Sequence, residues 1–449
     1  MKLVVENLGA VKKATIDLSK DLLVFTGENN TGKTYLAYAV HALYKHDLSG
    51  EGFGLQDLEF DKYGVYQYNL VEALTNQIFL ENIVNGYLCK NIKKNLPNHF
   101  ALDKSYFQNF NLKLTNIENS LIEQEIIDFE YQSLSHDGIS ISKEKGNALI
   151  NYKSSDTANN EYLFIKVRLT NQDILFELLF NKSKTYIFPS LREGIVLFNK
   201  ELSIIKNKTF DKILENRNGD AEIWSSLSKR FNRYPKPVKD SLEFARNLDV
   251  YKREESHFAY LADELEDTFL DGKIQIGEDG DVNFKMKDRK EAFEIHAASS
   301  TVKSLSYLSV YLRHIAQKGD FIIIDEPELN LHPDNQRKLA RFFGRLINEG
   351  FKLLISTHSD YIVRELNNLI MLKEGVNNKP EQTDELLKKY NYEKTQLIDK
   401  EQVGVYLFRK GKEVENIAVE ETGFSVPTID EEIRKLNQTT NDIIFTVFD

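Results

Sequence analysis

The stretch GENNTGKT at residues 27–34 constrains the fold more than any other part of the chain. It matches the phosphate-binding pattern G-x-x-x-x-G-K-[ST], with an apolar run at 22–26 before it and a helix-forming stretch at 33–44 after it. The order predicts a buried strand, a loop and a helix, which together bring backbone N–H groups and the positive end of a helix dipole to one point. The alternative is a Gly/Asn-rich turn before an ordinary helix, and the complete pattern in this context disfavours it.

Each part of this loop has a predicted role in binding a nucleotide. The glycines permit backbone conformations that side chains forbid, Lys33 is expected to reach the β and γ phosphates, and the Thr34 hydroxyl is expected to ligate Mg²⁺. The predicted nucleotide-binding residues of this stretch are Gly27, Asn29, Asn30, Thr31, Gly32, Lys33, Thr34 and Tyr35.

A second group of candidate site residues follows the apolar strand predicted within GDFIIIDEPELNLHP, residues 319–333. Asp325 ends this strand and is expected to hold the metal, whereas Glu326 is expected to act on the water that attacks the γ-phosphate. Two adjacent acids also occur in structural ion pairs, so this pattern alone leaves both interpretations open. A phosphate loop requires a metal-holding acid and a water-positioning group, and the combination predicts hydrolysis of a nucleoside triphosphate with Mg²⁺.

A third strand is predicted at FKLLISTHSD, residues 351–360, and it ends on His358. The helical stretch 336–350 between the second and third strands makes a β-α-β crossover, which places both strand ends at one edge of a sheet. His358 is therefore predicted to contact the γ-phosphate and, with Lys33 and Glu326, to belong to the catalytic group. A structural histidine at a strand end is the alternative.

A serine-rich segment, ASSTVKS, begins at Ala298 and precedes the acidic strand. Ser299, Ser300 and Thr301 are natural caps for a helix whose apolar residues begin at Val302. Capping alone accounts for these residues, but the N-terminus of such a helix is also an anion site.

Composition limits the classes of function. The net charge of −11 over 449 residues argues against a surface built for nucleic acid, although a local basic patch leaves nucleic-acid binding open. The single cysteine, Cys89, excludes an intramolecular disulfide and fits a reducing compartment. We find neither an apolar run of membrane-spanning length nor a signal peptide, and we expect a cytoplasmic protein that does not bind membranes.

The distribution of patterns along the chain predicts three parts. Residues 1–198 are expected to form the N-terminal part of an ATPase head with an antiparallel β subdomain, and the first two strands and the strand at 22–26 are expected to share a small antiparallel sheet. Residues 199–272 are expected to be a helical insertion, and residues 273–449 the C-terminal part of the head. We find no internal repeat and no sustained heptads.

With the loop, ASSTVKS, DEPELNLHP and STHSD in this order, the chain resembles ABC-type ATPases. It most resembles the SMC-like, RecF-like and OLD-like branch of bacterial ATPases, the AAA_15-type group, and the likeness extends to YIFPSLREGI at 186–195 and to GFSVPTIDEEIRKLN near the C-terminus. The resemblance implies an α/β fold, the ABC-type P-loop NTPase head, with a mixed sheet, an antiparallel β subdomain and a helical insertion.

The resemblance also implies that two heads sandwich two nucleotides, so that the chain is a homo-oligomer. Ser299, Ser300 and Lys303 of one head would then contact the nucleotide held by the other. Thr301 departs from the family pattern, which often carries glycine there, and its Cβ would hinder close approach to phosphate. For Arg192, a place at the nucleotide or coupling edge and a structural salt bridge remain equal alternatives.

The resemblance suggests two functions of different classes. The first is an ATPase switch in bacterial antiphage defence, similar to the two-gene Septu and PARIS systems. Only 91 residues follow His358 and they carry no convincing acidic metal cluster, so we expect no TOPRIM domain and place the effector, a nuclease or toxin, in a separate protein. The second is a RecF- or SMC-like ATPase of DNA repair or chromosome maintenance that binds DNA directly. A transporter subunit and a P-loop kinase fit the motif spacing less well.

Overall fold

The computed structural model describes most of the chain, in several separate ranges. The described residues are 1–45, 65–69, 84–117, 131–134, 139–147, 149–154, 184–197, 233–278 and 280–448.

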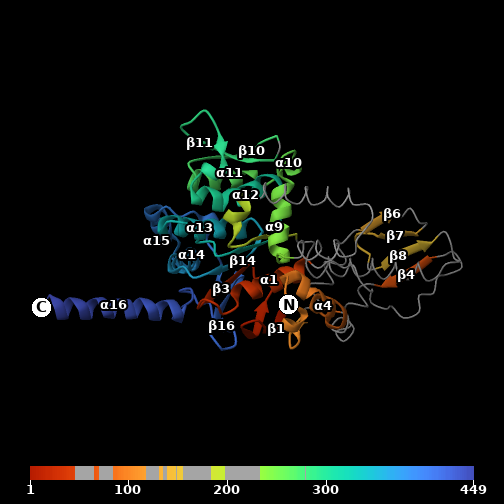
Figure 1. Ribbon diagram of the computed structural model, residues 1–449, viewed down its shortest axis with the longest axis horizontal. Coiled ribbons are helices and arrows are strands. Elements are labelled where there is room, and N and C mark those ends of the chain that lie inside the picture. The colour runs from red at the N-terminus through yellow and green to blue at the C-terminus, as the bar shows by residue number, and fades with distance from the viewer. Residues whose placement is uncertain are drawn as a thin grey trace, which may run out of the picture.

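The centre of the fold is a six-stranded sheet in the order β16-β15-β3-β14-β13-β9 (Figure 1). All neighbours are parallel except the edge strand β16. Every residue of β3, β13 and β15 is buried, as expected for parallel strands covered on both faces. The strands of this sheet are β3 (Leu22–Gly27), β9 (Thr185–Phe188), β13 (Phe321–Asp325), β14 (Lys352–Thr357), β15 (Val403–Phe408) and β16 (Glu415–Ile417).

Two hydrophobic cores lie on the two faces of this sheet, and alternate strand residues enter each of them. Leu22 and Val24 of β3 belong to one core, whereas Leu23 and Phe25 belong to the other. Figure 1 shows the helices α11 to α14 on one side of β3 and β14 and the strand β1 with α4 on the other side. The helices of the first layer are α11 (Ala259–Phe269), α12 (Ser300–His314), α13 (Pro333–Asn348) and α14 (Asp360–Asn378).

The second face is covered by α1 (Lys33–Tyr44), α4 (Lys90–Phe100) and a three-stranded antiparallel sheet. In that sheet β1 (Lys2–Leu8) pairs with both β2 (Val11–Asp17) and β5 (Asn111–Thr115). The prediction that the strand at 22–26 belongs to this sheet is wrong. Its uninterrupted apolar run is buried on both faces, which suits a central parallel strand, and it pairs with β14 and β15.

The remaining elements form smaller units. A four-stranded antiparallel sheet has the order β4-β8-β7-β6, and a three-stranded one has the order β10-β11-β12. The strands are β4 (Val65–Asn69), β6 (Tyr131–Leu134), β7 (Ile139–Lys143), β8 (Leu149–Ser154), β10 (Gly272–Ile276), β11 (Val282–Met286) and β12 (Phe293–Glu294). The helices are a π-helical turn (Val84–Cys89), α9 (Lys236–Arg246), α10 (Leu248–Tyr251), α15 (Pro380–Tyr390) and α16 (Pro427–Val447).

This architecture confirms the predicted α/β fold class, a P-loop NTPase head with a mixed sheet and antiparallel β units. The β-α-β crossover is also confirmed, because β13 and β14 are parallel neighbours joined through α13. Of the expected insertion at 199–272, residues 199–232 lie outside the described residues. Its described helices α9 and α11 pack into the same core as α12.

Among the described helices, none combines the length and the apolar character needed to cross a membrane.

Gly344 in α13 tests the packing of this layer. A Cβ at this position would lie 2.0 Å from the backbone oxygen of Gln396, and Asn348 one turn later donates to the carbonyls of Thr395 and Leu397. We expect Gly344→Ala to lower the free energy of unfolding by about 1–3 kcal/mol, as in other overpacked cores, because a backbone oxygen has little room to move. Thermal or urea unfolding measures the change. Gly194→Ala is the control, since its Cβ would meet nothing within 4 Å, and equal stability of the two variants would contradict the close approach.

Candidate active site

The phosphate-binding loop connects β3 to α1, as predicted. Gly27 has φ +122° and Gly32 has φ +98°, so both hold the left-handed conformations expected of them. A side chain at Gly27 would lie 2.1 Å from the backbone oxygen of Phe408, so the neighbouring strand β15 also requires a glycine here. The loop therefore rests against a strand from the C-terminal part of the chain.

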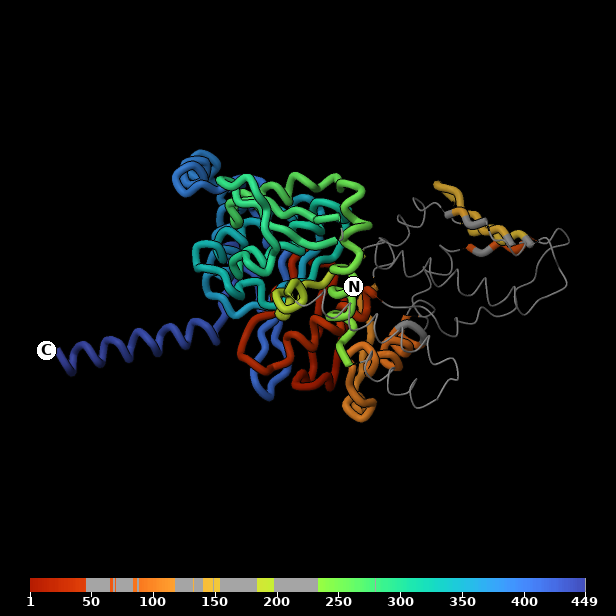
Figure 2. The backbone as a smooth tube through the Cα atoms, turned by 45° about the horizontal axis from the view of Figure 1, so that its top comes forward, coloured from red at the N-terminus to blue at the C-terminus, as the bar shows by residue number. Residues whose placement is uncertain are grey.

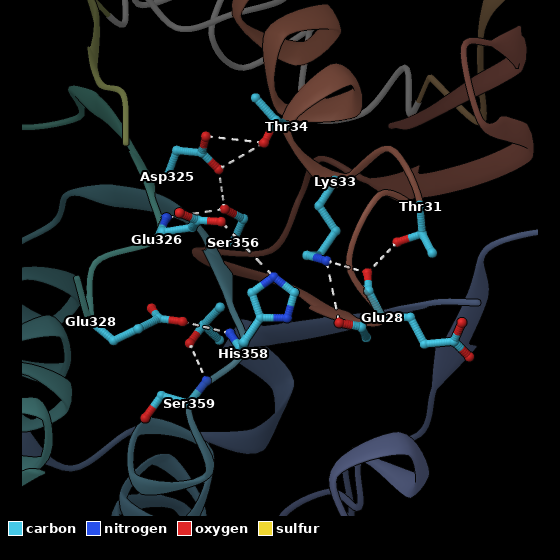
Figure 3. Close-up of polar contacts among 12 residues, drawn as sticks. Glu28, Thr31, Lys33, Thr34, Asp325, Glu326, Glu328, Ser356, His358 and Ser359 are labelled. Atoms are coloured by element: carbon cyan, nitrogen blue, oxygen red, sulfur yellow. Dashed lines mark hydrogen bonds and ion pairs between the residues drawn. The ribbon is translucent and has the colours of Figure 1, made fainter. Parts of the chain in front are cut away.

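Lys33 is buried and points back over the loop. Its Nζ donates to the carbonyls of Gly27, at 3.2 Å, and Glu28, at 2.6 Å (Figure 3). Burial lowers the pKa of Lys33 to about 8, against the opposing effect of nearby carboxylates led by that of Glu326. The ammonium thus lies in a site where its charge is incompletely compensated.

Thr34 and Asp325 meet across the site, from the start of α1 and the end of β13. Thr34 Oγ1 lies 3.2 and 3.1 Å from the two carboxylate oxygens of Asp325, and the Ser356 hydroxyl donates to the same carboxylate. A hydroxyl and a carboxylate facing each other are an oxygen donor set that suits Mg²⁺. The structure therefore brings together the two residues predicted to bind the metal.

Glu326 follows Asp325 in a left-handed conformation, with φ +50°. Its backbone N–H donates to Ser356 O, at 3.0 Å, and to Ser356 Oγ, at 3.2 Å, so that β14 holds the turn. Burial and then the charge of Asp325 raise the pKa of the Glu326 carboxyl. A half-buried carboxylate with a raised pKa and an open path to the cavity suits a proton acceptor.

His358 lies beside Glu326, with 4.0 Å between Nε2 and the nearer carboxylate oxygen. Burial, and then the charge of Lys33, lower the pKa of His358 to about 4, so the ring is neutral at physiological pH. The backbone N–H of His358 donates to Glu328, at 2.6 Å. A neutral imidazole held in this way can hydrogen-bond to an oxygen of a bound phosphate.

Ser356 and Glu328 are site residues that the sequence analysis missed. Ser356 lies in the motif STHSD and Glu328 lies in the motif DEPELNLHP, so their positions near His358 and Glu326 were the signal that could have indicated them. Ser356 holds Asp325 and Glu326, and Glu328 holds the turn that carries His358.

Arg192 lies beside the acidic turn at the edge of the site, one of the alternatives left open by the sequence, and within the part of the chain that the structure describes it forms no salt bridge. Its side chain is buried, and the guanidinium donates to the carbonyls of Asp325, at 2.9 Å, and Glu326, at 3.0 Å. A longer contact of 3.4 Å reaches Pro327 O. A planar fork of donors on successive carbonyls fixes the backbone turn that aims Glu326 into the site.

A cavity of about 650 Å³ opens over the phosphate loop. This volume lies within the range of small-molecule sites. Its walls include Asn29 to Tyr35 together with Glu326, Ser356 and His358. The cavity has further lining residues that the sequence did not indicate, namely Gly9, Ala10, Leu102, Tyr106 and Phe107.

The predicted signature residues lie elsewhere in the chain's structure. Ser299 caps α12 by accepting from the backbone N–H of Val302, at 3.4 Å, and Lys303 Nζ donates to His296 O, also at 3.4 Å. Ser299 and Ser300 are exposed, and neither they nor Lys303 line the cavity over the phosphate loop.

Comparison with known proteins identifies the family. The model of the AAA ATPase domain, AAA_15, matches residues 1–363, which include the loop, the acidic strand and His358. The chain belongs to the AAA ATPase domain family. The matched residues include most of those that line the cavity over the phosphate loop.

The other proteins that this ATPase resembles match it either over a short segment or at low sequence identity. The energy-coupling factor transporter ATP-binding protein EcfA2 of Mycoplasma mobile is 34% identical over 62 residues, which are 14% of this chain and 20% of that relative. Among solved structures, the Smc head domain of Pyrococcus furiosus bound to the C-terminal domain of ScpA is 14% identical, with 96% of this chain and 98% of that chain covered and a TM-score of 0.33. The SMC head domain of Thermotoga maritima is 10% identical, with 93% of this chain and 98% of that chain covered and a TM-score of 0.33.

The lowered pKa of Lys33 predicts how ATP affinity depends on pH. Bound phosphates favour the ammonium and raise its pKa, so binding takes up a proton once the free protein loses it above about pH 8. We expect full affinity below that pH and a loss approaching about tenfold per pH unit above it. Calorimetric titration from pH 7.5 to 9.5 measures this, in a range where the phosphates of ATP are already ionised. Lys33→Arg, which stays charged, is the control; a flat wild-type profile would refute the assignment.

We expect substitution of Arg192 to lower the rate of ATP hydrolysis without changing the affinity for ATP. In Arg192→Met, carbonyls of the acidic turn lose their donors, and a displaced Glu326 should lower kcat by about 10²-fold. ATP affinity should change little because Arg192 does not line the cavity over the loop. Arg192→Lys should restore part of the rate, since one ammonium cannot donate to two carbonyls in the same fork geometry.

The control for the loss of one cation is Arg289→Met, at an exposed position. A parallel fall in kcat and in ATP affinity for Arg192→Met, or a rate equal to that of the control, would rule out a positioning role.

Proposed function

We propose that this ATPase hydrolyses ATP by in-line attack of water and uses the cycle as a conformational switch for a separate effector protein. One observation carries the hydrolytic part: Glu326, Ser356, Lys33 and His358 line one cavity at the ends of adjacent parallel strands and the phosphate loop, and the buried Asp325 lies behind them in contact with Ser356 and Thr34. No other arrangement of polar groups in the described residues matches a phosphoryl-transfer site so closely.

Within this site each group has a distinct task. Thr34 and Asp325 would hold Mg²⁺, which supplies charge neutralisation between the β and γ phosphates. Lys33 turns from the loop carbonyls to the phosphate oxygens, Glu326 accepts the proton of the attacking water, and the neutral His358 donates to the γ-phosphate. In such a site the protein forms no covalent bond to the substrate. It accelerates the reaction by positioning the water and the phosphates and by stabilising their charge.

A second copy of the head is expected to complete the site. The N-terminus of α12 presents exposed Ser299 and Ser300, with Lys303 one turn later, as an anion site away from its own phosphate loop. In a head-to-head dimer these residues would contact the γ-phosphate held by the partner. Closure of the dimer would then depend on whether ATP is bound.

The switch is supported by a bridge of two adjacent side chains, Arg192 and Glu193. Arg192 binds the acidic turn, whereas Glu193 Oε1 accepts from Ser304 Oγ of α12 and from Asn330 Nδ2, each at 2.8 Å. The same few residues therefore contact the catalytic turn and the helix that carries the signature serines. The chain continues from this bridge toward residues 199–272, where we place the effector interface.

We infer that the effector is a nuclease or toxin and that the setting is bacterial antiphage defence, as in the two-gene systems that the motifs resemble. Nucleotide-driven closure can shift such a partner only by its difference in affinity for the open and closed heads. Salt-dependent binding of DNA by the purified chain would instead support the function in DNA repair or chromosome maintenance.

Glu326→Gln tests the hydrolytic switch. The amide should leave the metal and nucleotide in place but cannot accept the proton of water, so hydrolysis should slow by roughly 10² to 10⁴ fold and ATP should remain bound. Retention of radiolabelled ATP on the protein measures this. Lys33→Ala is the matched control, in which both binding and hydrolysis should be lost.

Both variants should then be co-expressed with the protein encoded next to the ATPase, and nuclease activity and cell toxicity measured. We expect Glu326→Gln to fix the output in one state and Lys33→Ala to fix it in the other. Release of ATP by Glu326→Gln at the wild-type rate would remove the catalytic assignment. Metal-dependent cleavage of nucleic acid by the isolated chain that survives Lys33→Ala would remove the switch.

A further inference from the structure

The C-terminal helix α16 leaves the body of the molecule and has no partner within the described structure. It has 21 residues, none of them buried, and Figures 1 and 2 show it extending away from the head in both views. Large apolar side chains are nevertheless exposed along it: Leu436 is 67% exposed, Ile443 53% and Val447 66%. Scattered exposed apolar residues are ordinary, but a helix that carries them along its length is not.

The base of this helix is fixed, so its direction is defined. Phe424 and Val426 just before it are buried, and Ile429 in its first turn packs partly against the same core. The backbone N–H and carbonyl of Phe424 bind the side-chain amide of Asn367, at 2.9 and 2.8 Å. Beyond Ile429 the helix has no such contact, although helices in proteins gain most of their stability from packing an apolar face.

The apolar residues of α16 repeat with spacings of four and three. The series is Ile429, Ile433, Leu436, Thr440, Ile443 and Val447. In heptad terms Ile433, Thr440 and Val447 occupy a positions, and Ile429, Leu436 and Ile443 occupy d positions. All three a residues are β-branched, and of the d residues only Leu436 is leucine, so the seam is apolar but does not by itself set the number of helices. The sequence analysis found no sustained heptads because this series covers fewer than three repeats.

We propose that α16 pairs with α16 of a second copy of this chain as a short coiled coil. The seam is self-complementary, since the same a and d residues would face one another. Glu432 and Thr439 at g positions would face Asn437 and Ile444 at e positions of a parallel partner, so no like charges are opposed. The proposal is independent of the proposed function, because it involves no residue of the ATPase site.

The apolar area on α16 is large enough for pairing with α16 of a second copy. Burying the free seam and Ile444 on two helices removes on the order of 1,000 Å² from water, at roughly 60–120 Å² per aliphatic side chain. That is about the lower limit for a specific interface. The pair is therefore expected to act with a second contact between the copies, which raises the effective concentration of one helix near the other.

The charges disfavour a lipid surface as the occupant. Amphipathic helices that bind membranes carry Lys and Arg on the polar face. The polar positions of α16 instead carry Asp430, Glu431, Glu432 and Asp442 against Arg434 and Lys435. This acidic balance would oppose anionic headgroups.

Single cysteines test the proposal on the full-length chain. The native Cys89 is buried and burial raises the pKa of its thiol to about 12, so it contributes little background. We expect Thr440→Cys to form a disulfide-linked dimer under mild oxidation if the helices are parallel, and a mixture of Leu436→Cys and Thr440→Cys to form a mixed dimer if they are antiparallel. Gln438→Cys, at an f position on the outer face, is the matched control and should remain monomeric on a non-reducing gel.

A second set of variants shows whether the seam drives the pairing. Ile433→Asp with Ile443→Asp in either cross-linking background should abolish the dimer band, whereas Gln438→Asp with Asn441→Asp, which adds the same charge outside the seam, should preserve it. None of these positions is buried in the head, so ATP binding should be unchanged in all of them. No cross-link in either orientation, or equal cross-linking at residue 438, would overturn the proposal, as would a band that survives the seam substitutions. Failure of the ATPase assignment would instead appear as loss of ATP binding.

Discussion

The parallel pairing of β13 with β14 is the constraint on which the rest of the site depends. In this register Asp325 lies opposite Ser356, so the serine backbone and hydroxyl hold both the carboxylate of Asp325 and the N–H of Glu326. A shift of one residue would turn every strand side chain toward the opposite core and move the acids off the edge. The two cores on the faces of the sheet fix this register, and with it the distance from the acids at the end of β13 to the phosphate loop that follows β3, on the far side of β14.

The electrostatics of the site follow from burial before any ligand is considered. Desolvation lowers the pKa of Lys33 and of His358 and raises that of Glu326, so each group is shifted toward its neutral form. A nucleotide phosphate would reverse the balance for Lys33, because its negative charge favours the ammonium. Binding of a phosphate would therefore stabilise the charged form of Lys33 and draw its ammonium away from the loop carbonyls that it contacts.

The sequence predicted the local elements of the site well and the long-range contacts poorly. The strand-loop-helix unit, the crossover and the apposition of Thr34 with Asp325 follow from motif spacing and from the rule that parallel strands end at one edge. The sheet to which β3 belongs could not be derived, because an apolar run does not state its partners. The hydrogen bonds from Arg192 to backbone carbonyls could not be predicted either, because every residue has a carbonyl group and the sequence does not show which of them a side chain will meet. The wall formed by Leu102 and Tyr106 depends on a loop whose placement no pattern encodes.

The contact between Gly27 and Phe408 has a consequence for how the protein is made. The strand β3 (Leu22–Gly27) is synthesised long before β15 (Val403–Phe408), the strand that flanks it. Until β15 arrives, β3 has an open hydrogen-bonding edge and apolar side chains without their neighbours, a state prone to aggregation. In the nascent chain the phosphate loop therefore lacks the strand that supports it until β15 has been made.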